Sequence, residues 1–318
     1  MRFAAVIYGL LMLFALAVPW SGIYPVFVMK LMCFALFACA YNLLLGFSGM
    51  LSFGHAAFFG ASAYAAAWLA TAQGWGPGAA LVAGTLVAAA LGLIIGVIAI
   101  RRRGIYFAMI TLAMAQLVYF VCLEAPFTGG ENGLQGVPRG RLFGVLSLNS
   151  DTTLYYVVFA IFTAAFLFIR RIVHSPFGQV LNAIRGNEAR AISLGYDVDR
   201  YRLLAFVLSA ALAGLAGSLK ALVLGFVTLS DVLQANSGEV ILMTLVGGVG
   251  TFAGPVVGAA LIVTLQEYLS DMVGGWVTVI IGGVFIACVL TFRRGIVGEL
   301  VRLRPKPGGG LTPPDAPP

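Results

Sequence analysis

Charged residues are scarce in this sequence, and their scarcity excludes the ordinary soluble classes of protein. Only 10% of the 318 residues are Asp, Glu, Lys or Arg, whereas a soluble globular domain carries about a quarter. Hydrophobic residues make up 61% of the chain, and its mean hydropathy is +1.00. We therefore expect an all-α, polytopic bundle of transmembrane helices and no soluble enzyme core.

Sequence motifs of nucleotide hydrolysis, metal binding and nucleophilic catalysis are missing as well. No Gly-Lys-Ser/Thr occurs, GGVGTFAG does not match GxGxxG, and neither HExxH nor GxSxG is found. The four cysteines lie singly in apolar runs without CxxC spacing, at Cys33, Cys39, Cys122 and Cys288. The sequence thus predicts no catalytic site, cofactor, metal site or disulfide framework within this chain.

Long apolar runs are abundant instead, and they predict the membrane spans. A transmembrane helix needs about 20 largely apolar residues, and about eight runs qualify. The expected spans are residues 3–20, 24–45, 50–70, 78–100, 104–124, 152–170, 203–224 and 273–292. Residues 1–20 also fit a secretory signal, but we favour an uncleaved first helix because many spans follow it.

The positions of Lys and Arg predict the orientation, because these residues favour cytoplasmic loops. They gather at 101–103, in the loop 170–202 and after the last span, whereas Asp and Glu predominate in the opposite loops. Both termini are then cytoplasmic, and the net charge of +7 needs no nucleic-acid partner. Lys30 and Lys220 lie near outer span ends, where we expect their side chains to reach the interface.

Region 238–270 is expected to enter from the outer side and to return to it. Span 203–224 ends outside and the last span ends inside, so the chain between them crosses an even number of times. Its residues are too few for two full spans of about 20 residues each. We expect a re-entrant hairpin of short or half helices that turns at GGVGTFAGP, residues 247–255.

Small residues recur at every fourth position, which predicts closely packed helices. The series are Ser48, Ser52, Ala56 and Gly60; Gly84, Ala88, Gly92 and Gly96; Ser209, Ala213, Gly217 and Ala221; and Gly250, Gly254 and Gly258. Gly54 and His55 lie off the first series. A histidine in a span marks a pathway or a polar contact, so His55 either lines a path or bonds to a carbonyl of a broken helix.

The cytoplasmic loop 171–202 predicts two short helices. Ser175 is a natural N-cap, and Pro176 occupies the first helical position after it. Gly186-Asn187 then provides a break and a new cap before a second helix from Glu188 to Leu194.

Two further features of this loop bear on what it contacts. Gly195 suits the C′ position after the second helix. The first helix has one apolar face, from which Asn182 and Arg185 are turned away. That face consists of Phe177, Val180, Leu181 and Ile184. It predicts either docking of a cytosolic partner or contact with the lipid surface, and periodicity does not separate the two.

Five stretches spread over the core carry a further signal. They are YNLLLGFSGMLSFGHAAFFGASAY, RRRGIYFAMITLAMAQ, TGGENGLQGVP, SPFGQVLNAIRGNEARAISLGYDVDRYRLLAFVLSAALAGLAGSL and LVGGVGTFAGPVVGAA. In their content and order, over roughly residues 38–292, they resemble the LivM-type permease of branched-chain amino-acid ABC importers.

The resemblance implies a permease subunit that moves branched-chain, hydrophobic amino acids into the cytoplasm across the bacterial inner membrane. The implied partners are a LivH-type permease, two cytosolic ABC ATPases that bind ATP and Mg²⁺, a periplasmic amino-acid-binding protein and membrane lipid. The implied coupling segment contains Arg185, Asn187, Glu188, Arg190, Ala191 and Gly195. A permease domain at 1–292 precedes a tail, 293–318, whose Pro and Gly content predicts a disordered cytoplasmic segment.

Polar residues within the predicted spans and turns are the candidates for the translocation path. They are Asn42, Ser48, Ser52, His55, Thr111, Gln116 and Thr251. Relatives with similar blocks handle urea or short amides, so the cargo stays open. An ion-coupled secondary transporter and a non-transporting scaffold are the other classes, and the lack of acidic residues at span centres weakens the former.

Overall fold

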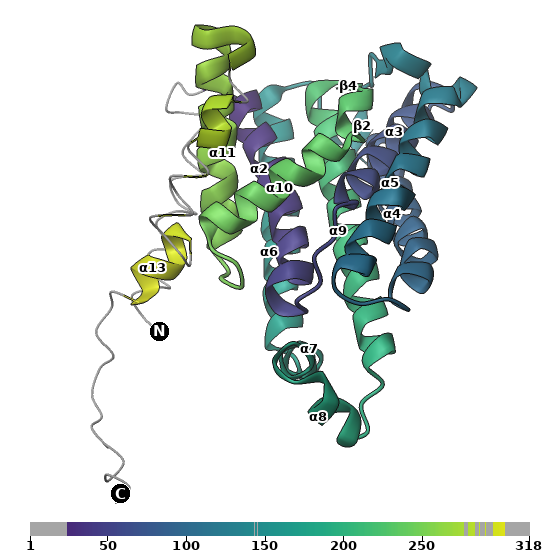
Figure 1. Cartoon of the computed structure of the whole chain (residues 1–318). Coiled ribbons are helices and arrows are strands. Elements are labelled where there is room, and N and C mark those ends of the chain that lie inside the picture. Colours follow the sequence, from purple (N-terminus) through teal and green to yellow (C-terminus); the bar gives the residue numbers. More distant parts are fainter. Residues whose placement is uncertain are drawn as a thin grey trace, which may run out of the picture.

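The computed structural model describes residues 24–302 apart from 143, 145, 277–278, 284–285, 287–289 and 291–294. The expected first span, 3–20, lies outside the described residues, and so do nine of the twenty residues of the last span, 273–292. The described part is a bundle of α-helices, most of which run roughly parallel to one another (Figure 1).

Five of the described helices are long and apolar enough to cross a membrane, so the chain is a multi-span helical membrane protein. They are α2 (Pro25–Asn42) with its π-helical extension η2 (Leu43–Phe47), α4 (Pro77–Ala99), α5 (Ile105–Glu124), α6 (Asp151–His174) and α9 (Val198–Leu224). These confirm the spans expected at 24–45, 78–100, 104–124, 152–170 and 203–224, with bounds that shift by at most five residues.

Helices α2 and α9 form the centre of the bundle. Each buries 72% of its most apolar stretch, whereas α4, α5 and α6 bury only 28–33%. The outer helices therefore expose large apolar side chains, among them Leu86 of α4 and Ile105 of α5. Apolar surface of this extent needs lipid or a partner protein to cover it.

The small-residue series allow the helices around α9 to pack closely. A Cβ atom at Gly92 of α4 would lie 2.5 Å from the Cβ of Ala210 in α9. Helix α3 (His55–Thr71) is equally close, since a Cβ at Gly217 would collide with the Phe59 carbonyl. These contacts leave no room for a side chain and confirm the predicted close packing.

The first small-residue series is not a helical ridge, and that prediction is wrong. Helix α2 continues as η2 to Phe47, residues 48–54 are non-helical, and α3 begins only at His55. Gly49 has a φ of 74°, which a residue with a side chain rarely adopts. Ser48 and Ser52 thus lie on an irregular segment, residues 48–54, called the break below, and the expected span 50–70 starts five residues late.

The hairpin turns where the glycines predict. Helix α10 (Gln234–Gly247) ends and α11 (Gly254–Val273) begins within GGVGTFAGP. Helix α10 crosses the bundle obliquely, and α11 returns beside α2 (Figure 1). Helix α10 is short at 14 residues, but α11 has 20, so the prediction of two short or half helices is wrong for α11.

Short elements occupy the two ends of the bundle (Figure 1). The end that we call the strand end carries β1 (Leu134–Gln135), β2 (Arg141–Leu142), β3 (Leu146–Ser147), β4 (Phe226–Val227), η3 (Pro126–Thr128), η4 (Gly130–Asn132), η5 (Leu229–Asp231) and η6 (Gly274–Trp276). Strand β1 pairs with β4 and β2 with β3, both antiparallel. The opposite end carries α7 (Pro176–Gly186) and α8 (Glu188–Ser193), called the α7–α8 pair.

The beginning of the tail is helical, which corrects the prediction of a disordered tail for these residues. Helix α13 (Ile296–Arg302) contacts α10 and α11. Its sequence, IVGELVR, contains apolar residues at helical spacing that the Pro and Gly content of the following residues obscured. Residues 303–318 lie outside the described residues.

Candidate functional site

His55 begins α3 and is fully buried. The rings around it belong to Phe37, Tyr41, Phe58 and Phe206, with centroids 5.1–6.4 Å from the imidazole. Its Nε2 lies 2.8 Å from Ser209 Oγ, and that hydroxyl donates its single proton to the Ala40 carbonyl at 2.5 Å. Nε2 is therefore the donor to Ser209, and the imidazole joins the start of α3 to α9 and α2.

The polar groups of the break are bonded within the protein. Tyr41 Oη donates to the Ser52 carbonyl at 3.1 Å, and the Gly54 amide donates to Ser52 Oγ at 3.3 Å. The Phe53 amide donates to Thr111 Oγ1 of α5 at 3.3 Å. Non-helical backbone at membrane depth is stable when protein groups satisfy it in this way.

Asn42 joins the end of α2 to the turn of the hairpin. Its Nδ2 donates to the Thr251 carbonyl and its Oδ1 accepts from the Gly250 amide, both at 2.9 Å. Thr251 Oγ1 in turn accepts from the amide of Gly254 at 3.1 Å, at the start of α11. Hydrogen bonds of the Asn42 side-chain amide thus hold together two segments that are about 209 residues apart in sequence.

The seven path candidates divide into a cluster and one separate residue. Ser48 is buried and its hydroxyl donates to the Leu44 carbonyl at 2.6 Å, so it belongs to the same region as the residues above. Gln116 lies partly exposed on α5, five residues after Thr111, and no hydrogen bond of its side chain is found within the described residues. The structure brings six candidates together as a scaffold around the break and leaves Gln116 apart.

A cavity of about 430 Å³ lies beside the break, between it and α5. Its lining is mainly apolar, from Gly49, Met50, Leu51 and Phe53 of the break and from the first two turns of α5, with three arginines in addition. The arginines are Arg102, Arg103 and Arg202. The volume falls in the range of small-molecule pockets, about 300–1,000 Å³. None of the seven path candidates lines this cavity.

The caps predicted for the α7–α8 pair are present. The Gly178 amide donates to Ser175 Oγ at 3.5 Å, and the Arg190 amide donates to Asn187 Oδ1 at 3.0 Å. Helix α8 ends in a Schellman motif, since the amides of Gly195 and Tyr196 donate to carbonyls in the last turn. Gly195 has a φ of 85°, as its C′ position requires.

The apolar face of α7 packs against the chain itself. Leu181 and Ile184 are buried, and the Phe177 ring stacks on Tyr201 of α9 with centroids 5.6 Å apart. Ala191 of α8 is also buried, in a cluster with Ile184 and Val198. This face is therefore occupied, and it is free neither for a partner nor for lipid.

The free surface of the pair lies at its tip instead. Ile192 is 51% exposed and Leu194 is 68% exposed, and Tyr196 and Arg190 are exposed next to them. Exposed apolar residues beside a cation are typical of a docking surface. Sequence periodicity pointed to a face that the chain itself covers, because the pattern of α7 does not distinguish burial within the chain from burial by a partner.

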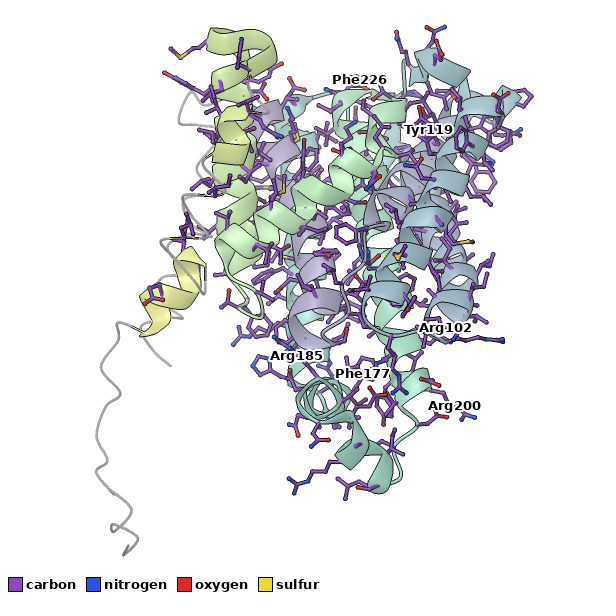
Figure 2. The ribbon with its side chains drawn as sticks, viewed as in Figure 1. Arg102, Tyr119, Phe177, Arg185, Arg200 and Phe226 are labelled. Carbon is purple, nitrogen blue, oxygen red and sulfur yellow. The ribbon has the colours of Figure 1, made fainter. Side chains whose placement is uncertain are left out.

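Arg185 is directed into the bundle and not toward the tip of the pair. Its Nη1 donates to the Gly46 carbonyl in η2, where the end of the helix leaves carbonyls without an intrahelical donor. A Cβ atom at Gly49 would lie 3.0 Å from Arg185 Cγ, and one at Gly250 would lie 3.6 Å from its Nη1. The side chain thus packs against the break and the hairpin turn, next to the Asn42 contact. Figure 2 shows Arg185 beside α7, at the lower end of the bundle.

Glu188 is also bonded within the chain. Arg202 of α9 donates to both of its carboxylate oxygens at 3.0 Å, and Arg103, from the α4–α5 loop, lies 2.7 Å from Oε1. The side chain of Arg202 is 14% exposed and that of Arg103 is 59% exposed. Sequence reasoning used both arginines only as topology signals, and no spacing rule connects them to Glu188.

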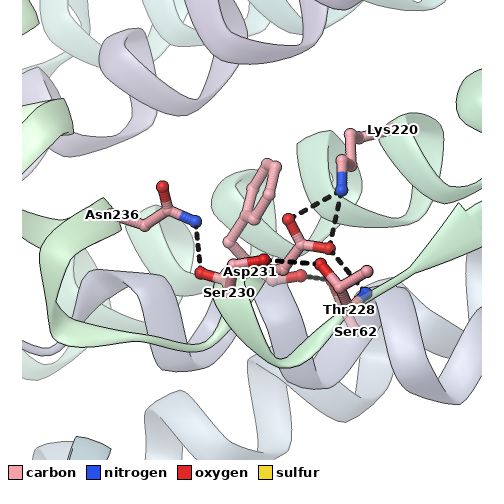
Figure 3. Close-up of polar contacts among 7 residues, drawn as sticks. Ser62, Lys220, Thr228, Ser230, Asp231 and Asn236 are labelled. Atoms are coloured by element: carbon pink, nitrogen blue, oxygen red, sulfur yellow. Dashed lines mark hydrogen bonds and ion pairs between the residues drawn. The ribbon is translucent and has the colours of Figure 1, made fainter. Parts of the chain in front are cut away.

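The strand end holds a buried ion pair between Lys220 and Asp231 (Figure 3). Lys220 Nζ lies 2.7 and 2.6 Å from the two carboxylate oxygens, and both side chains are 6% exposed. Asp231 Oδ2 also accepts from the Thr228 amide at 3.1 Å. The expectation that Lys220 reaches the interface is wrong, because η5 brings a carboxylate to it.

Lys30 differs from Lys220. It forms an ion pair with Glu267 of α11 at 2.6 Å, and the two side chains are 30% and 53% exposed. This contact joins α2 to the returning helix of the hairpin.

Comparison with known proteins gives relatives along most of the chain. A family model described as "Branched-chain amino acid transport system / permease component" matches residues 24–289. The permease protein LivM of Escherichia coli K12 is 29% identical over 84% of this chain and 68% of its own length. The probable LivM of Methanocaldococcus jannaschii is 25% identical over 59% and 56%, and E. coli LivH is 26% identical over 84% and 91%.

No solved structure matches this chain. The family match covers well over half of the residues and coincides with the described bundle. The chain therefore belongs to the family of permease components of branched-chain amino-acid transport systems, which are transport subunits without a catalytic activity or cofactor of their own.

Proposed function

We propose that this chain is the permease subunit of an ATP-driven importer that carries branched-chain or other hydrophobic amino acids into the cytoplasm. The observation that supports it best is the position of Arg185, which connects the α7–α8 pair directly to the break beside the cavity. The names of the LivM and LivH relatives support the same cargo and assembly.

In this proposal the strand end is periplasmic and the α7–α8 end is cytoplasmic. The chain then has eight spans and the α10–α11 hairpin in a permease domain at 1–292, with both termini in the cytoplasm, and lies in the bacterial inner membrane. The many arginines at the α7–α8 end support this orientation. Residues 293–318 form its cytoplasmic tail, of which α13 is the ordered beginning.

The translocation path runs between this chain and a LivH-type permease, along the exposed face of α5. That face carries Ile105, Met109 and the partly exposed Gln116, and the cavity lies at its cytoplasmic end. Gln116 then contacts the cargo. The other six path candidates have a different role here, since they hold the break in shape: Asn42, Ser48, Ser52, His55, Thr111 and Thr251.

Two cytosolic ABC ATPases, which bind ATP and Mg²⁺, dock at the tip of the α7–α8 pair, and a periplasmic binding protein delivers the cargo at the strand end. Arg190, Ile192 and Leu194 form the docking contact. Four further residues support this contact from within the chain. Asn187 caps α8 and Glu188 forms an ion pair, while Ala191 packs in a buried cluster and Gly195 has a positive φ.

Two arginines of the same segment test this division. Arg190→Ala should reduce co-purification of the ATPases, because it alters the tip. Arg185→Ala should leave co-purification intact but lower transport of labelled leucine and the cargo-stimulated ATPase rate at least severalfold, because it removes the connection to the break. Equal loss of co-purification in both variants would contradict these roles. Arg200→Ala is the control, because Arg200 is exposed and pairs with Asp197, three residues before it.

The cargo is tested separately with the assembled importer. Labelled leucine, phenylalanine and urea are compared in vesicles, and uptake of leucine above the other two supports the proposal. Preferred uptake of urea would assign the chain to an amide transporter of the same family. Uptake by the chain alone, driven by an ion gradient without ATPases, would replace the importer with a secondary transporter.

A further inference from the structure

The α7–α8 pair contacts both sides of the cavity, and the two contacts come from neighbouring parts of the pair. Arg185 of α7 bonds to Gly46 and packs on Gly49, which lines the cavity from the break. Glu188 of α8 pairs with Arg103, which lines the cavity from the α4–α5 loop. The pair thus contacts lining residues on two sides of the cavity, Gly49 by packing and Arg103 by an ion pair.

The two arginines of Glu188 differ in a way that assigns them different roles. Arg202 makes two parallel bonds and is largely buried, a geometry that holds the carboxylate in a fixed position. Arg103 makes one short contact and is mostly exposed, so water can replace its partner at little cost. Arg202 therefore anchors Glu188, and Arg103 is the contact that can form and break.

Arg103 also stands where a small movement changes access to the cavity. It precedes Gly104, which has a φ of 59° and no atom within 4 Å of the Cβ position, and α5 starts at Ile105. A glycine in open space at the start of a helix lets the loop change conformation without a steric barrier. Because Arg103, Gly104 and the first turns of α5 all line the cavity, a change in the conformation of this loop changes that side of the cavity.

We propose that Arg103 is a positioning residue that links the α5 side of the cavity to the α7–α8 pair through Glu188. When ATPases displace the pair, the displacement acts on the α4–α5 loop through the Arg103 contact and on the break through Arg185, so the cytoplasmic mouth of the cavity changes width. This inference rests on the proposed function, in which the pair receives the ATPases. The contact itself is a property of this chain alone.

The test measures access to the cavity, and it needs neither cargo nor transport. The four native cysteines are changed to alanine, and Met109→Cys, on the exposed part of the lining, reports access. Full-length chain in inside-out membrane vesicles is labelled with a membrane-impermeant maleimide. Arg103→Gln should raise the labelling rate about 1.5- to 5-fold, the range that a partly exposed ion pair supports.

Arg102→Gln is the matched control. Arg102 is adjacent, also lines the cavity and carries the same charge, but no ion pair of its side chain is found within the described residues. Both variants remove one positive charge beside the reporter, so an electrostatic effect on thiol reactivity is equal in the two. Arg103→Lys, which keeps the pair, should restore the original rate and shows that the site folds with a substituted side chain.

A double-mutant cycle identifies the partner. Glu188→Gln should raise the labelling rate by itself, and Arg103→Gln should add nothing in that background. Equal labelling rates in Arg103→Gln and Arg102→Gln, or additive effects with Glu188→Gln, would overturn the inference. Those outcomes leave the importer assignment intact. If instead every variant of the tip still bound the ATPases, the importer assignment would be contradicted, but the labelling result could still be interpreted.

Discussion

The two ends of the bundle each hold an ion pair, and the pairs are built differently. At the strand end, Lys220 and Asp231 are both 6% exposed and share two short contacts. At the α7–α8 end, the Arg103 side chain is 59% exposed and reaches Glu188 through one short contact. A buried pair is costly to separate because each charge would remain without solvent, whereas an exposed pair separates into water at little cost.

This difference between the two ion pairs indicates which end of the bundle is able to move. The Lys220–Asp231 pair joins α9 to η5 and, with the Thr228 amide, keeps the chain before α10 in one conformation. The Glu188 contacts join elements that the proposed mechanism displaces. A buried pair at the strand end and an exposed Arg103–Glu188 contact at the α7–α8 end suit the proposed mechanism, in which the subunit is driven from the α7–α8 end.

The largest effect is expected from breaking the buried pair. Asp231→Ala leaves the Lys220 ammonium buried without a partner and should lower the free energy of unfolding by about 3–5 kcal/mol. Thermal unfolding of the purified chain in detergent measures this loss. Lys220→Met combined with Asp231→Leu removes both charges and should recover much of the stability; a double variant as unstable as the single one would contradict this account.

A smaller loss of stability is expected between the two ends, at His55. His55→Ala removes a fully buried ring from its aromatic surroundings and leaves Ser209 without its donor, which should cost about 2–4 kcal/mol. Folded yield should fall, while transport per folded molecule should persist because the imidazole does not line the cavity. Gln116→Ala should show the reverse, normal yield with altered transport. Normal yield of His55→Ala with lost transport would instead place the imidazole on the path.

At the α7–α8 end, Gly195→Ala should cost about 1–2 kcal/mol, because a φ of 85° strains a residue that has a Cβ atom. The strain falls on the end of α8, so hydrogen exchange should accelerate there and ATPase binding should weaken. Gly186→Ala is the matched control, since Gly186 lies in α7 with no atom near its Cβ position. Unchanged exchange in α8 of the Gly195 variant would speak against the proposed support of the tip.

The smallest effect on stability is expected from Arg103→Gln, below about 1 kcal/mol and weaker still in high salt. This is the opposite of the expected result for Asp231→Ala, although both variants break an ion pair. Unfolding at low and at high salt measures both. A loss for Arg103→Gln as large as that for Asp231→Ala would remove the contrast between the two ends.

Short-range signals made much of the fold predictable. The lengths of apolar runs predicted five described spans, and GGVGTFAGP marked the hairpin turn. The caps Ser175 and Asn187 and the C′ residue Gly195 stand where their chemistry requires. Each of these features depends on a few neighbouring residues, so one sequence suffices to recognise it.

The candidate site was less predictable, because its parts meet across the bundle. The spacing of Ser48, Ser52, Ala56 and Gly60 suggested a helix, but tertiary contacts stabilise a π-helix followed by the break. Lys220 seemed free to reach the interface until η5 placed Asp231 against it. Propensity and spacing carry no information about partners that come from another helix.

The sequence alone therefore specified a helical membrane protein of a recognisable permease type, together with its turns and caps, since those follow from composition and local chemistry. Tertiary packing decided which groups meet. It brings Asn42 to Thr251 across 209 residues and Arg185 to Gly46 across 139 residues. Close approach of glycine-rich helices brings these segments within hydrogen-bonding distance, and only the folded chain contains that proximity.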